Sequence, residues 1–246
     1  MLSRCDVEMK IVEVYSSISG EAPTQGVLTT FVRLAGCNLE CWKGYRGLTG
    51  CDTPFKDEYR EQSVGDVVAE IEGFKIAHVL FTGGEPLLQW RDVSEVISRL
   101  GVQRQPVTLW ENFSIETNGT VSVAPFLKSL PCGCRSRTRF VSDVKTPSSG
   151  YSKIRDIDQQ VDELDPAYGD CLKFVVGDQD DLKFVDTVLL ETSASTLPCY
   201  VSPLWGIMDP LEIVEWMKTS KWARRGSVSL SLQIHKILWD PVQRGV

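Results

Sequence analysis

Cys37, Cys41 and Cys51 lie close together in the segment RLAGCNLECWKGYRGLTGCDT, which contains no histidine. Three thiolates on one loop can hold three irons of a 4Fe-4S cubane and leave the fourth iron open to another ligand. A structural zinc site or a fully protein-ligated cluster normally uses four protein ligands, so a set of three indicates an open coordination position. The alternative is three ordinary buried thiols in a reducing compartment, and the cysteines alone do not decide between the two.

The spacer between the second and third cysteines is long. Three residues separate Cys37 from Cys41, and nine separate Cys41 from Cys51. Lengthening a flexible spacer from two residues to nine costs only about 1.3 kcal/mol of loop-closure free energy. This cost is small beside the free energy of several metal–thiolate bonds, so the spacing weakens the prediction of a cluster without excluding it.

Polar residues also follow apolar runs at several other places. The segment TGGEP follows HVLF, and its Gly83 and Gly84 lack a β-carbon, so the backbone there can turn sharply and approach a ligand. Glu85 can accept hydrogen bonds from a ligand amine or from neighbouring amides. The segments ETNGT (116–120), KTPSSG (145–150) and SPLWG (202–206) follow further apolar runs. Each isolated motif is equally consistent with a structural turn.

Three further candidates have both a functional and a structural interpretation. Arg33 lies in the apolar run TTFVRLAG, where an arginine that points into a site needs an anionic partner such as a carboxylate, unless the strand turns it outward. SISGE (17–21) is either a lip over a site or a plain surface loop. His235 is one of two histidines, and most single histidines are structural; His78 is expected to pack beneath the sheet.

These candidates need a scaffold that brings distant segments together, and short β-rich runs alternate with amphipathic stretches along the chain. Strands are expected at 10–15, 29–35, 78–83, 108–117, 139–144, 171–176 and 198–203, and helices at 63–74, 90–101, 123–130, 179–191 and 209–220. The alternation predicts an α/β fold whose parallel sheet is either open or curled into a partial barrel, with about six βα units. The loops at the carboxyl ends of such strands share one rim, where ligands bind.

Length and composition set broad limits. A chain of 246 residues with 42% hydrophobic and 24% charged residues is expected to form a single globular domain, 1–246, with 1–8 as a loose N-terminal extension. The net charge of −7 argues against nucleic acid as a partner. No apolar run approaches the length of a membrane span, and the N-terminus does not resemble a secretory signal. We therefore expect a cytoplasmic protein whose other five cysteines are reduced.

Taken in order, the motifs VYSSISGE, FVRLAGCNLEC, GCDT, LFTGGEPLLQ, IETNGT, LKFVV, YVSPL and LQIHKILW resemble those of the 7-carboxy-7-deazaguanine synthase family of radical S-adenosylmethionine enzymes. The resemblance runs from about Lys10 to the last residue, and it implies a partial (βα)6 barrel that usually forms a homodimer. It also implies that 6-carboxy-5,6,7,8-tetrahydropterin is converted to 7-carboxy-7-deazaguanine with loss of ammonia, in 7-deazapurine (queuosine-type) biosynthesis. The implied cofactors are a 4Fe-4S cluster, S-adenosylmethionine and a magnesium ion, with an electron donor such as a flavodoxin.

The resemblance further assigns roles to residues of this chain. Cys37, Cys41 and Cys51 would bind the cluster, and Thr53 would bind the magnesium ion. Contacts with S-adenosylmethionine are implied for Gly84, Glu85, Thr117, Asn118, Ser142 and Lys145. Contacts with the pterin are implied for Ile18, Ser19, Gly20, Glu21, Arg33, Thr82, His235 and Val246, with Arg33 paired to the pterin carboxylate.

The chain departs from the family pattern in the long Cys41–Cys51 spacer, in SDVK (142–145) where SPK is usual, and in SISGE where IQGEG is common. Two other hypotheses remain open: a radical activase that acts on a glycine of a partner protein, and a non-catalytic module in which zinc or a cluster only folds the loop. Arg33 and the CDT and QIHK segments favour a small carboxylated substrate. A broad exposed apolar face would favour a protein partner, and unfolding on chelation without any effect of S-adenosylmethionine would favour the module.

Overall fold

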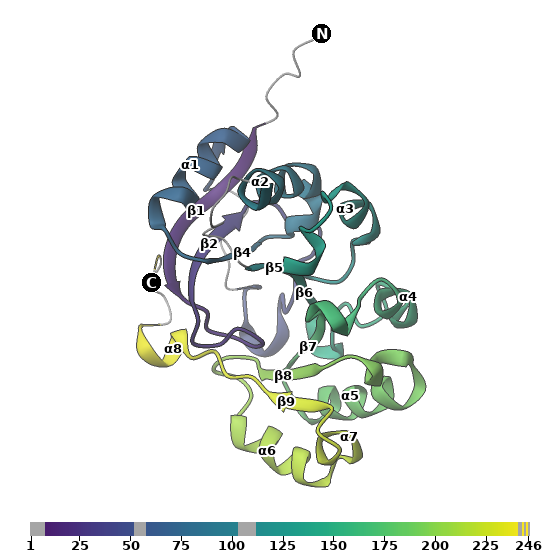
Figure 1. The fold of residues 1–246 in the computed structure, drawn as a ribbon. Helices are drawn as coiled ribbons and strands as arrows, with labels where there is room; N and C mark the ends of the chain where they lie inside the picture. The colour runs from purple at the N-terminus through teal and green to yellow at the C-terminus, as the bar shows by residue number, and fades with distance from the viewer. Residues whose placement is uncertain (1–7, 52–57, 103–111, 241–242, 244, 246) are drawn as a thin grey trace.

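The computed structural model of the chain describes residues 8–51, 58–102, 112–240, 243 and 245. Within them, nine strands form one sheet in the order β3-β1-β2-β4-β5-β6-β7-β8-β9 (Figure 1). The strands are β1 (Met9–Ile18), β2 (Leu28–Leu34), β3 (Arg60–Gln62), β4 (His78–Gly83), β5 (Asn112–Thr117), β6 (Thr138–Asp143), β7 (Cys171–Val176), β8 (Cys199–Pro203) and β9 (Val228–Leu230). Strand β1 pairs antiparallel with both β2 and β3, and every neighbouring pair from β2 to β9 is parallel.

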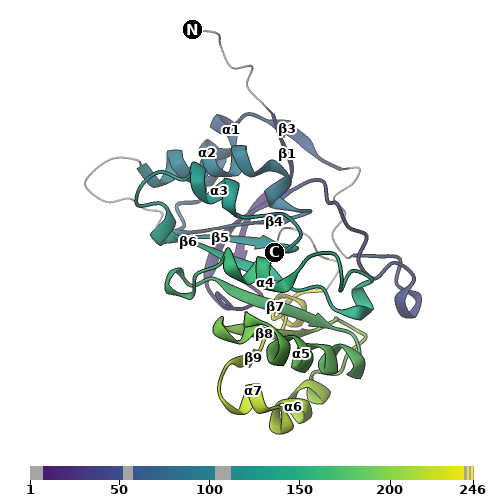
Figure 2. The same cartoon turned by 90° about the vertical axis from the view of Figure 1, so that its right-hand side faces the viewer.

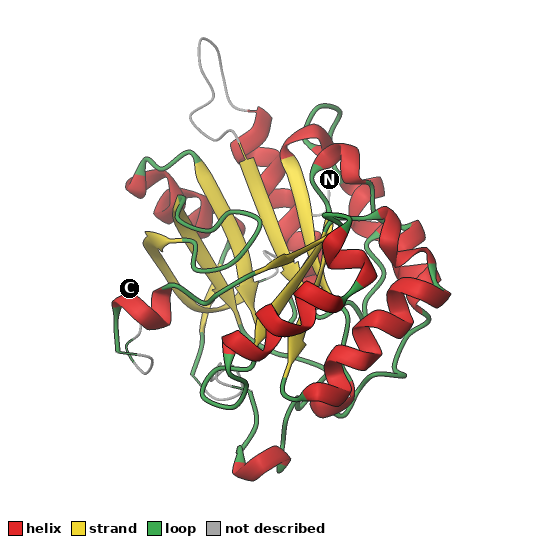
Figure 3. Ribbon diagram, turned by 90° about the horizontal axis from the view of Figure 1, so that it is seen from below, coloured by secondary structure: helices red, strands yellow, loops and turns green. Residues whose placement is uncertain are grey.

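Helices connect the successive parallel strands and lie on the outer side of the curved sheet (Figure 1 and Figure 3). They are α1 (Val64–Phe74), α2 (Trp90–Val102), α3 (Ala124–Ser129), α4 (Ile157–Asp162), α5 (Gln179–Glu191), α6 (Pro210–Thr219) and α7 (Lys221–Arg224), and α8 (His235–Leu238) follows β9. In the described part of the chain this gives six βα crossovers in a sheet with two open edges, β3 and β9. The predicted α/β partial barrel is therefore confirmed, whereas the assignment of residues 1–8 as a loose extension stays a prediction because 1–7 are outside the described residues.

The seven predicted strands and five predicted helices all form, with ends that differ by a few residues, and residues 108–111 of the strand predicted at 108–117 lie outside the described residues. The strands β3 and β9 and the helices α4, α7 and α8 were not predicted. The strands β3 and β9 have three residues each, α7 and α8 have four each, and α4 (IDQQVD) has two apolar residues, so none of them contains enough apolar residues to set a period.

The two faces of the sheet differ in chemistry. The outer face packs apolar side chains such as Val32, Phe81 and Phe113 against the helices, and all three are fully buried. Along the strands, the apolar residues of this core alternate with residues that face inward, and some of these are charged. Asp143 of β6, for example, lies in register with Lys173 of β7. The apolar face drives the sheet and helices together, so the polar inner face is free to carry chemistry. Across the described residues, no helix is both long and apolar enough to span a bilayer.

Candidate active site

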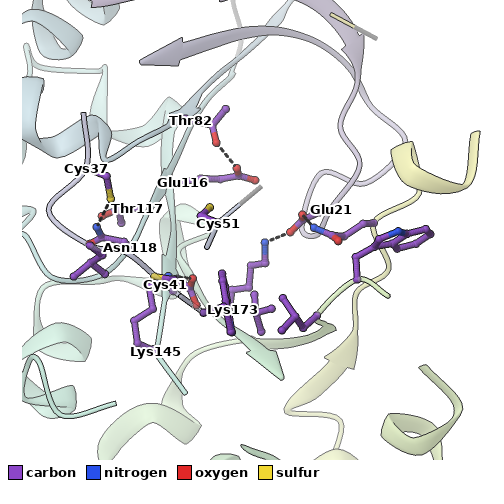
Figure 4. A pocket seen from close by; sticks show the side chains of 18 of the residues that line it. Glu21, Cys37, Cys41, Cys51, Thr82, Glu116, Thr117, Asn118, Lys145 and Lys173 are labelled. Carbon is purple, nitrogen blue, oxygen red and sulfur yellow. Dashed lines mark hydrogen bonds and ion pairs between the residues drawn. The ribbon is translucent and has the colours of Figure 1, made fainter. Parts of the chain in front are cut away.

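A cavity of about 400 Å³ opens at the carboxyl ends of the parallel strands. Its lining comes from the β1–β2 loop, the loop after β2, β4 to β8 and the loops that follow them, and the segment that leads into α8, including Lys236 of α8. Figure 4 shows how side chains from these distant segments converge on one space. The shared rim expected for a parallel α/β fold is thus present.

The three cysteines all line this cavity. Cys41 is buried, Cys37 is partly buried and Cys51 is exposed. Asn118 donates a hydrogen bond from Nδ2 to the Cys37 Sγ at 3.6 Å. Burial raises the pKa of the Cys41 thiol, and the nearby Lys145 ammonium opposes this shift. The loop therefore presents three thiols to one space and has a cation close to them.

Lys145 supplies that cation from just after β6. Its ammonium is nearly buried and lies 2.5 Å from the Asp143 carboxylate and 5.6 Å from the centre of the Trp42 ring. Burial would lower the pKa of Lys145, but Asp143 and the thiols of Cys41 and Cys51 outweigh burial and raise it, so the side chain stays charged. A positive charge here stabilises thiolates, which are the form that binds metal.

The donor set fits an iron–sulfur cluster better than a single ion. Among the described residues, no three His, Cys, Asp or Glu side chains are grouped tightly enough to hold one metal ion. A cubane of four irons and four sulfides is wider than a single ion, so thiols spread around one cavity suit it. A closed zinc site, which is one of the two forms of the folding-module hypothesis, has no counterpart among the described residues, whereas the form with a cluster stays open.

The TGGEP turn is joined directly to the start of the cysteine loop. The Gly84 amide donates to the Leu34 carbonyl at 2.8 Å, and the Glu85 amide donates to the Gly36 carbonyl at 2.7 Å. A β-carbon at position 84 would lie 1.8 Å from the Gly36 carbonyl oxygen. Glycine at this position is thus required by the close approach of two backbones, and Gly84 itself lines the cavity beside the thiols.

Glu85 lies beneath the cavity rather than on its wall. Its carboxylate is fully buried and accepts hydrogen bonds from the amides of Leu87 (2.9 Å) and Asn118 (2.6 Å) and from the Thr117 hydroxyl (2.8 Å). Burial raises the pKa of Glu85, while these three donors favour its charged form. The visible role of Glu85 is to hold Thr117 and Asn118 on the cavity wall, and its predicted contact with S-adenosylmethionine stays a prediction.

Ser142 and Lys145 in the SDVK segment have different surroundings. Lys145 lines the cavity as described above. Ser142 is buried, accepts a hydrogen bond from Gln160 Nε2 at 2.8 Å and is absent from the cavity wall. The described geometry thus offers Lys145, and not Ser142, to a bound ligand.

Predicted pterin contacts gather on the opposite side of the cavity. Glu21 lines the wall, and its carboxylate accepts a hydrogen bond from Gln233 Nε2 at 2.6 Å, across 212 positions of sequence. Gly20 abuts the imidazole of His235, since a β-carbon at position 20 would lie 1.8 Å from the ring Nδ1. The structure therefore brings the SISGE and QIHK segments together, although Ile18, Ser19, Gly20 and His235 lie behind the wall.

The side chain of Arg33 on β2 is held by residues of the neighbouring strand β1. Its Nε donates to Glu13 at 2.7 Å and its terminal nitrogen donates to the Tyr15 hydroxyl at 3.0 Å. The side chain is 22% exposed and does not reach the cavity wall. Pairing with a substrate carboxylate stays a prediction, as do the roles of Thr53 and Val246, which lie outside the described residues.

Several wall residues were not predicted from the sequence. One of them, Glu116, accepts a hydrogen bond at 2.7 Å from the hydroxyl of Thr82, which is itself a predicted site residue. Burial raises the pKa of the Glu116 carboxyl. The unpredicted charged and polar wall residues are Glu116, Asp143, Lys173, Gln233 and Lys236. A charged residue within an apolar strand is the sequence signal that marks Glu116, Asp143 and Lys173, whereas Gln233 and Lys236 lie beyond the end of β9 and carry no such signal.

The long spacer between Cys41 and Cys51 folds back on itself and is fastened to β7–α5. The loop extends from the carboxyl ends of the strands (Figure 2) and contains a 3-10 turn, Tyr45–Gly47. The Tyr45 hydroxyl donates to Asp178 at 2.7 Å, and the Tyr45 ring lies against Gly177. Burial and the Asp178 carboxylate raise the pKa of Tyr45 to about 12, so the phenol remains a donor. These contacts of Tyr45 fix the position of the spacer relative to β7 and α5.

Tyr45→Phe should loosen this anchor without changing the cavity wall. Loss of a hydrogen bond to a carboxylate is expected to lower the free energy of unfolding by about 1.5 kcal/mol and to speed amide hydrogen exchange in residues 42–50. Exchange mass spectrometry of the cluster-free protein measures this. Tyr168→Phe, on an exposed ring, is the matched control, and equal exchange in both variants would contradict the anchor.

Comparison with known proteins agrees with this geometry. A family model described as a 4Fe-4S single cluster domain matches residues 23–147. A 7-carboxy-7-deazaguanine synthase of Clostridium acetobutylicum is 33% identical over 248 residues, which cover 96% of this chain and 99% of the relative. A synthase of the same name from Methanospirillum hungatei is 36% identical over 235 residues, which cover 95% and 86%.

A solved structure has the same fold. The crystal structure of QueE from Escherichia coli superposes with a TM-score of 0.60 at 19% identity and covers 92% of this chain and 93% of that one. The near full-length relatives favour the synthase over the activase and over the non-catalytic module. The chain therefore belongs to the 7-carboxy-7-deazaguanine synthase family of radical S-adenosylmethionine enzymes.

Proposed function

We propose that the cavity at the carboxyl ends of the strands is where this chain carries out the reaction of its family. The reaction is the conversion of 6-carboxy-5,6,7,8-tetrahydropterin to 7-carboxy-7-deazaguanine with loss of ammonia. The observation that supports this site is the meeting of Cys37, Cys41 and Cys51 with Gly84 on one wall. These thiols would hold the 4Fe-4S cluster and leave one iron for S-adenosylmethionine.

The wall next to the thiols suits S-adenosylmethionine. When bound, this cofactor supplies a carbon radical that takes a hydrogen atom from the pterin ring and later returns it. Gly84 presents its backbone to the cavity, and Thr117 and Asn118, which are held in place by Glu85, present polar groups. Trp42 and Val141 add apolar surface that keeps water from the reacting atoms.

The opposite wall suits the pterin. Glu21 and Glu116 are acceptors for the ring N–H and amino groups, and Trp205 gives a flat surface on which a ring can stack. Arg33 of β2 is the register neighbour of Thr82 on β4. Two of its guanidinium nitrogens already donate hydrogen bonds to Glu13 and Tyr15. It remains the proposed partner of the pterin carboxylate, because an arginine has five donor hydrogens and these bonds use two.

Four finer assignments are also proposed. Thr53 would bind a magnesium ion together with the substrate carboxylate and waters, as suits a cation that keeps part of its water shell. A one-electron donor such as a flavodoxin would reduce the cluster, and two copies of the chain would form a homodimer as in the family. We also propose that the enzyme works in the cytoplasm, where reducing conditions keep cysteines free, and all seven cysteines in the described residues are free.

Anaerobically reconstituted protein is expected to form the deazaguanine acid when it is given reductant, S-adenosylmethionine, magnesium and the carboxylated tetrahydropterin. Mass spectrometry of the product measures turnover, and the same sample without S-adenosylmethionine is the control. Omitting magnesium should slow product formation if the ion binds the substrate carboxylate. A sample with a full complement of cluster iron that makes no product would refute the proposal.

A further inference from the structure

Lys173 is a charged residue in the middle of the apolar strand β7, and its side chain points into the cavity. The Lys173 side chain is 14% exposed, and its ammonium forms an ion pair with the Glu21 carboxylate. The second oxygen of Glu21 is held by Gln233. Figure 4 shows this pair on the side of the cavity away from Cys37. A buried ion pair often adds little to the net stability of a protein. Stability alone therefore does not explain why a lysine is buried beside the proposed pterin wall.

The reaction supplies a reason. Substrate and product differ by one molecule of ammonia, so the conversion as a whole is redox-neutral. The product contains an aromatic five-membered ring, and forming it requires that an amine leave one ring carbon while the neighbouring carbon loses a proton. Departure of the amine breaks a carbon–nitrogen bond and is far easier when a nearby acid protonates the nitrogen, and formation of the double bond transfers a proton from carbon to a base. A group in the cavity that gives one proton and takes the other would therefore speed ammonia loss.

We propose that Lys173 makes both proton transfers of ammonia loss and that Glu21 positions it; this inference rests on the proposed function. As the carbon–nitrogen bond breaks, its electron pair leaves with the nitrogen, which takes a proton from the Lys173 ammonium. The neutral amine of Lys173 then takes the proton from the neighbouring ring carbon, and the electron pair of that C–H bond forms the ring double bond. Ammonia is released and Lys173 ends as it began, as an ammonium.

The other cations on the wall suit this role less well. Lys145 is paired with Asp143 beside the thiols, and its pKa is raised, so it keeps its proton. Burial and the neighbouring Lys236 ammonium lower the pKa of Lys173, so this lysine, unlike Lys145, is shifted toward giving up its proton. The Glu21 carboxylate in contact with Lys173 opposes this shift and favours the ammonium form, which is the form that gives the first proton.

The groups that face Lys173 come from four elements. Glu21 approaches from the β1–β2 loop and Lys236 from α8. Asp143 on β6 and Tyr200 on β8 are its register neighbours within the sheet. Only Glu21 contacts the ammonium as an ion pair among the described residues. Changes at Glu21 and Lys236 should therefore shift the Lys173 proton equilibrium in opposite directions.

The decisive experiment separates hydrogen abstraction from ammonia loss in the cluster-loaded enzyme. With substrate deuterated at the ring carbon that bears the carboxylate, Lys173→Met should still move deuterium into S-adenosylmethionine, while product formation falls by about 100-fold or more. Lys173→Arg keeps the charge but holds its proton too tightly, so it should show the same split. Deuterium transfer and product falling together, or restored turnover in Lys173→Arg, would overturn the inference.

A pH profile gives a second test that does not depend on replacing Lys173. Loss of the ammonium ends turnover at high pH, so Glu21→Gln should move this limb of the kcat profile to lower pH. Lys236→Met should move it to higher pH, because it removes a repelling charge. Lys183→Met, at an exposed position, is the control with an unchanged profile. Identical limbs in all variants would overturn the inference, whereas a wild-type enzyme without product would refute the proposed function instead.

Discussion

Replacement of Cys41 by alanine is expected to abolish the 4Fe-4S cluster and to lower product formation by more than about 100-fold, since even loss of an outer-shell partner of a metal costs up to that factor. Cys41 is the buried member of the triad, and its thiol lies near the Lys145 ammonium. Two thiolates cannot hold a cubane against loss of iron as three can. Iron and sulfide analysis, electron paramagnetic resonance of the reduced sample and the product assay measure the effect.

The matched control is Cys132→Ala, which removes an exposed thiol that does not line the cavity. This variant should keep wild-type iron content and turnover, because a cysteine outside the site has no ligand role. A Cys41→Ala protein with full iron content and an unchanged spectrum would show that Cys41 is not a ligand. The same treatment applied to Cys37 and Cys51 tests the rest of the triad.

Gly84→Ala is expected to destabilise the cluster-free protein by about 3 kcal/mol, the upper part of the usual range for overpacking. The new methyl group would lie 1.8 Å from the Gly36 carbonyl oxygen, and that oxygen accepts the Glu85 amide. The obstacle is backbone on both sides, so no side-chain rotation can relieve it. In a chain of this size the Tm should fall by about 6–12 °C, and scanning calorimetry of the cluster-free protein measures this.

Gly73→Ala is the control for the same chemical change. Gly73 lies in α1, and a β-carbon there would meet nothing within 4 Å. Replacing a helical glycine by alanine should stabilise the protein by about 0.5–1 kcal/mol. If Gly84→Ala matched this control in Tm, the close approach of the TGGEP turn to the cysteine loop would be wrong.

The strands and helices that build the barrel were predictable because their signals are local. The run HVLFTG gave β4 from His78 to Gly83 at its observed ends, and QDDLKFVDTVLLE gave α5 in the same way. A stretch of apolar residues, or an apolar stripe with the helical period, requires burial wherever the chain takes it. Elements such as β9, with three residues, contain too few periods and form only because β8 presents an edge to pair with.

The candidate site was predictable only in part. The cysteine triad, Gly84 and the polar segment 116–120 carried signals of residue type and spacing, and the structure brings them to one cavity. The sequence could not reveal that Glu85 holds Thr117 and Asn118 from below. Nor did it indicate that Ser142 turns away toward Gln160. Whether a strand residue faces the cavity or the core depends on register, which one sequence does not specify.

The amino-acid order determined the sequence of βα units, the three thiols and the sharp turn that follows β4, because short-range periodicity and residue type suffice for these features. Only the tertiary structure decided which charges meet. Glu21, Lys173 and Gln233 come from three segments far apart in the chain and form one cluster because sheet curvature and strand register bring them together. Electrostatic interactions depend on distance in space, and these distances are set only when the sheet has curved and its strands have paired in register.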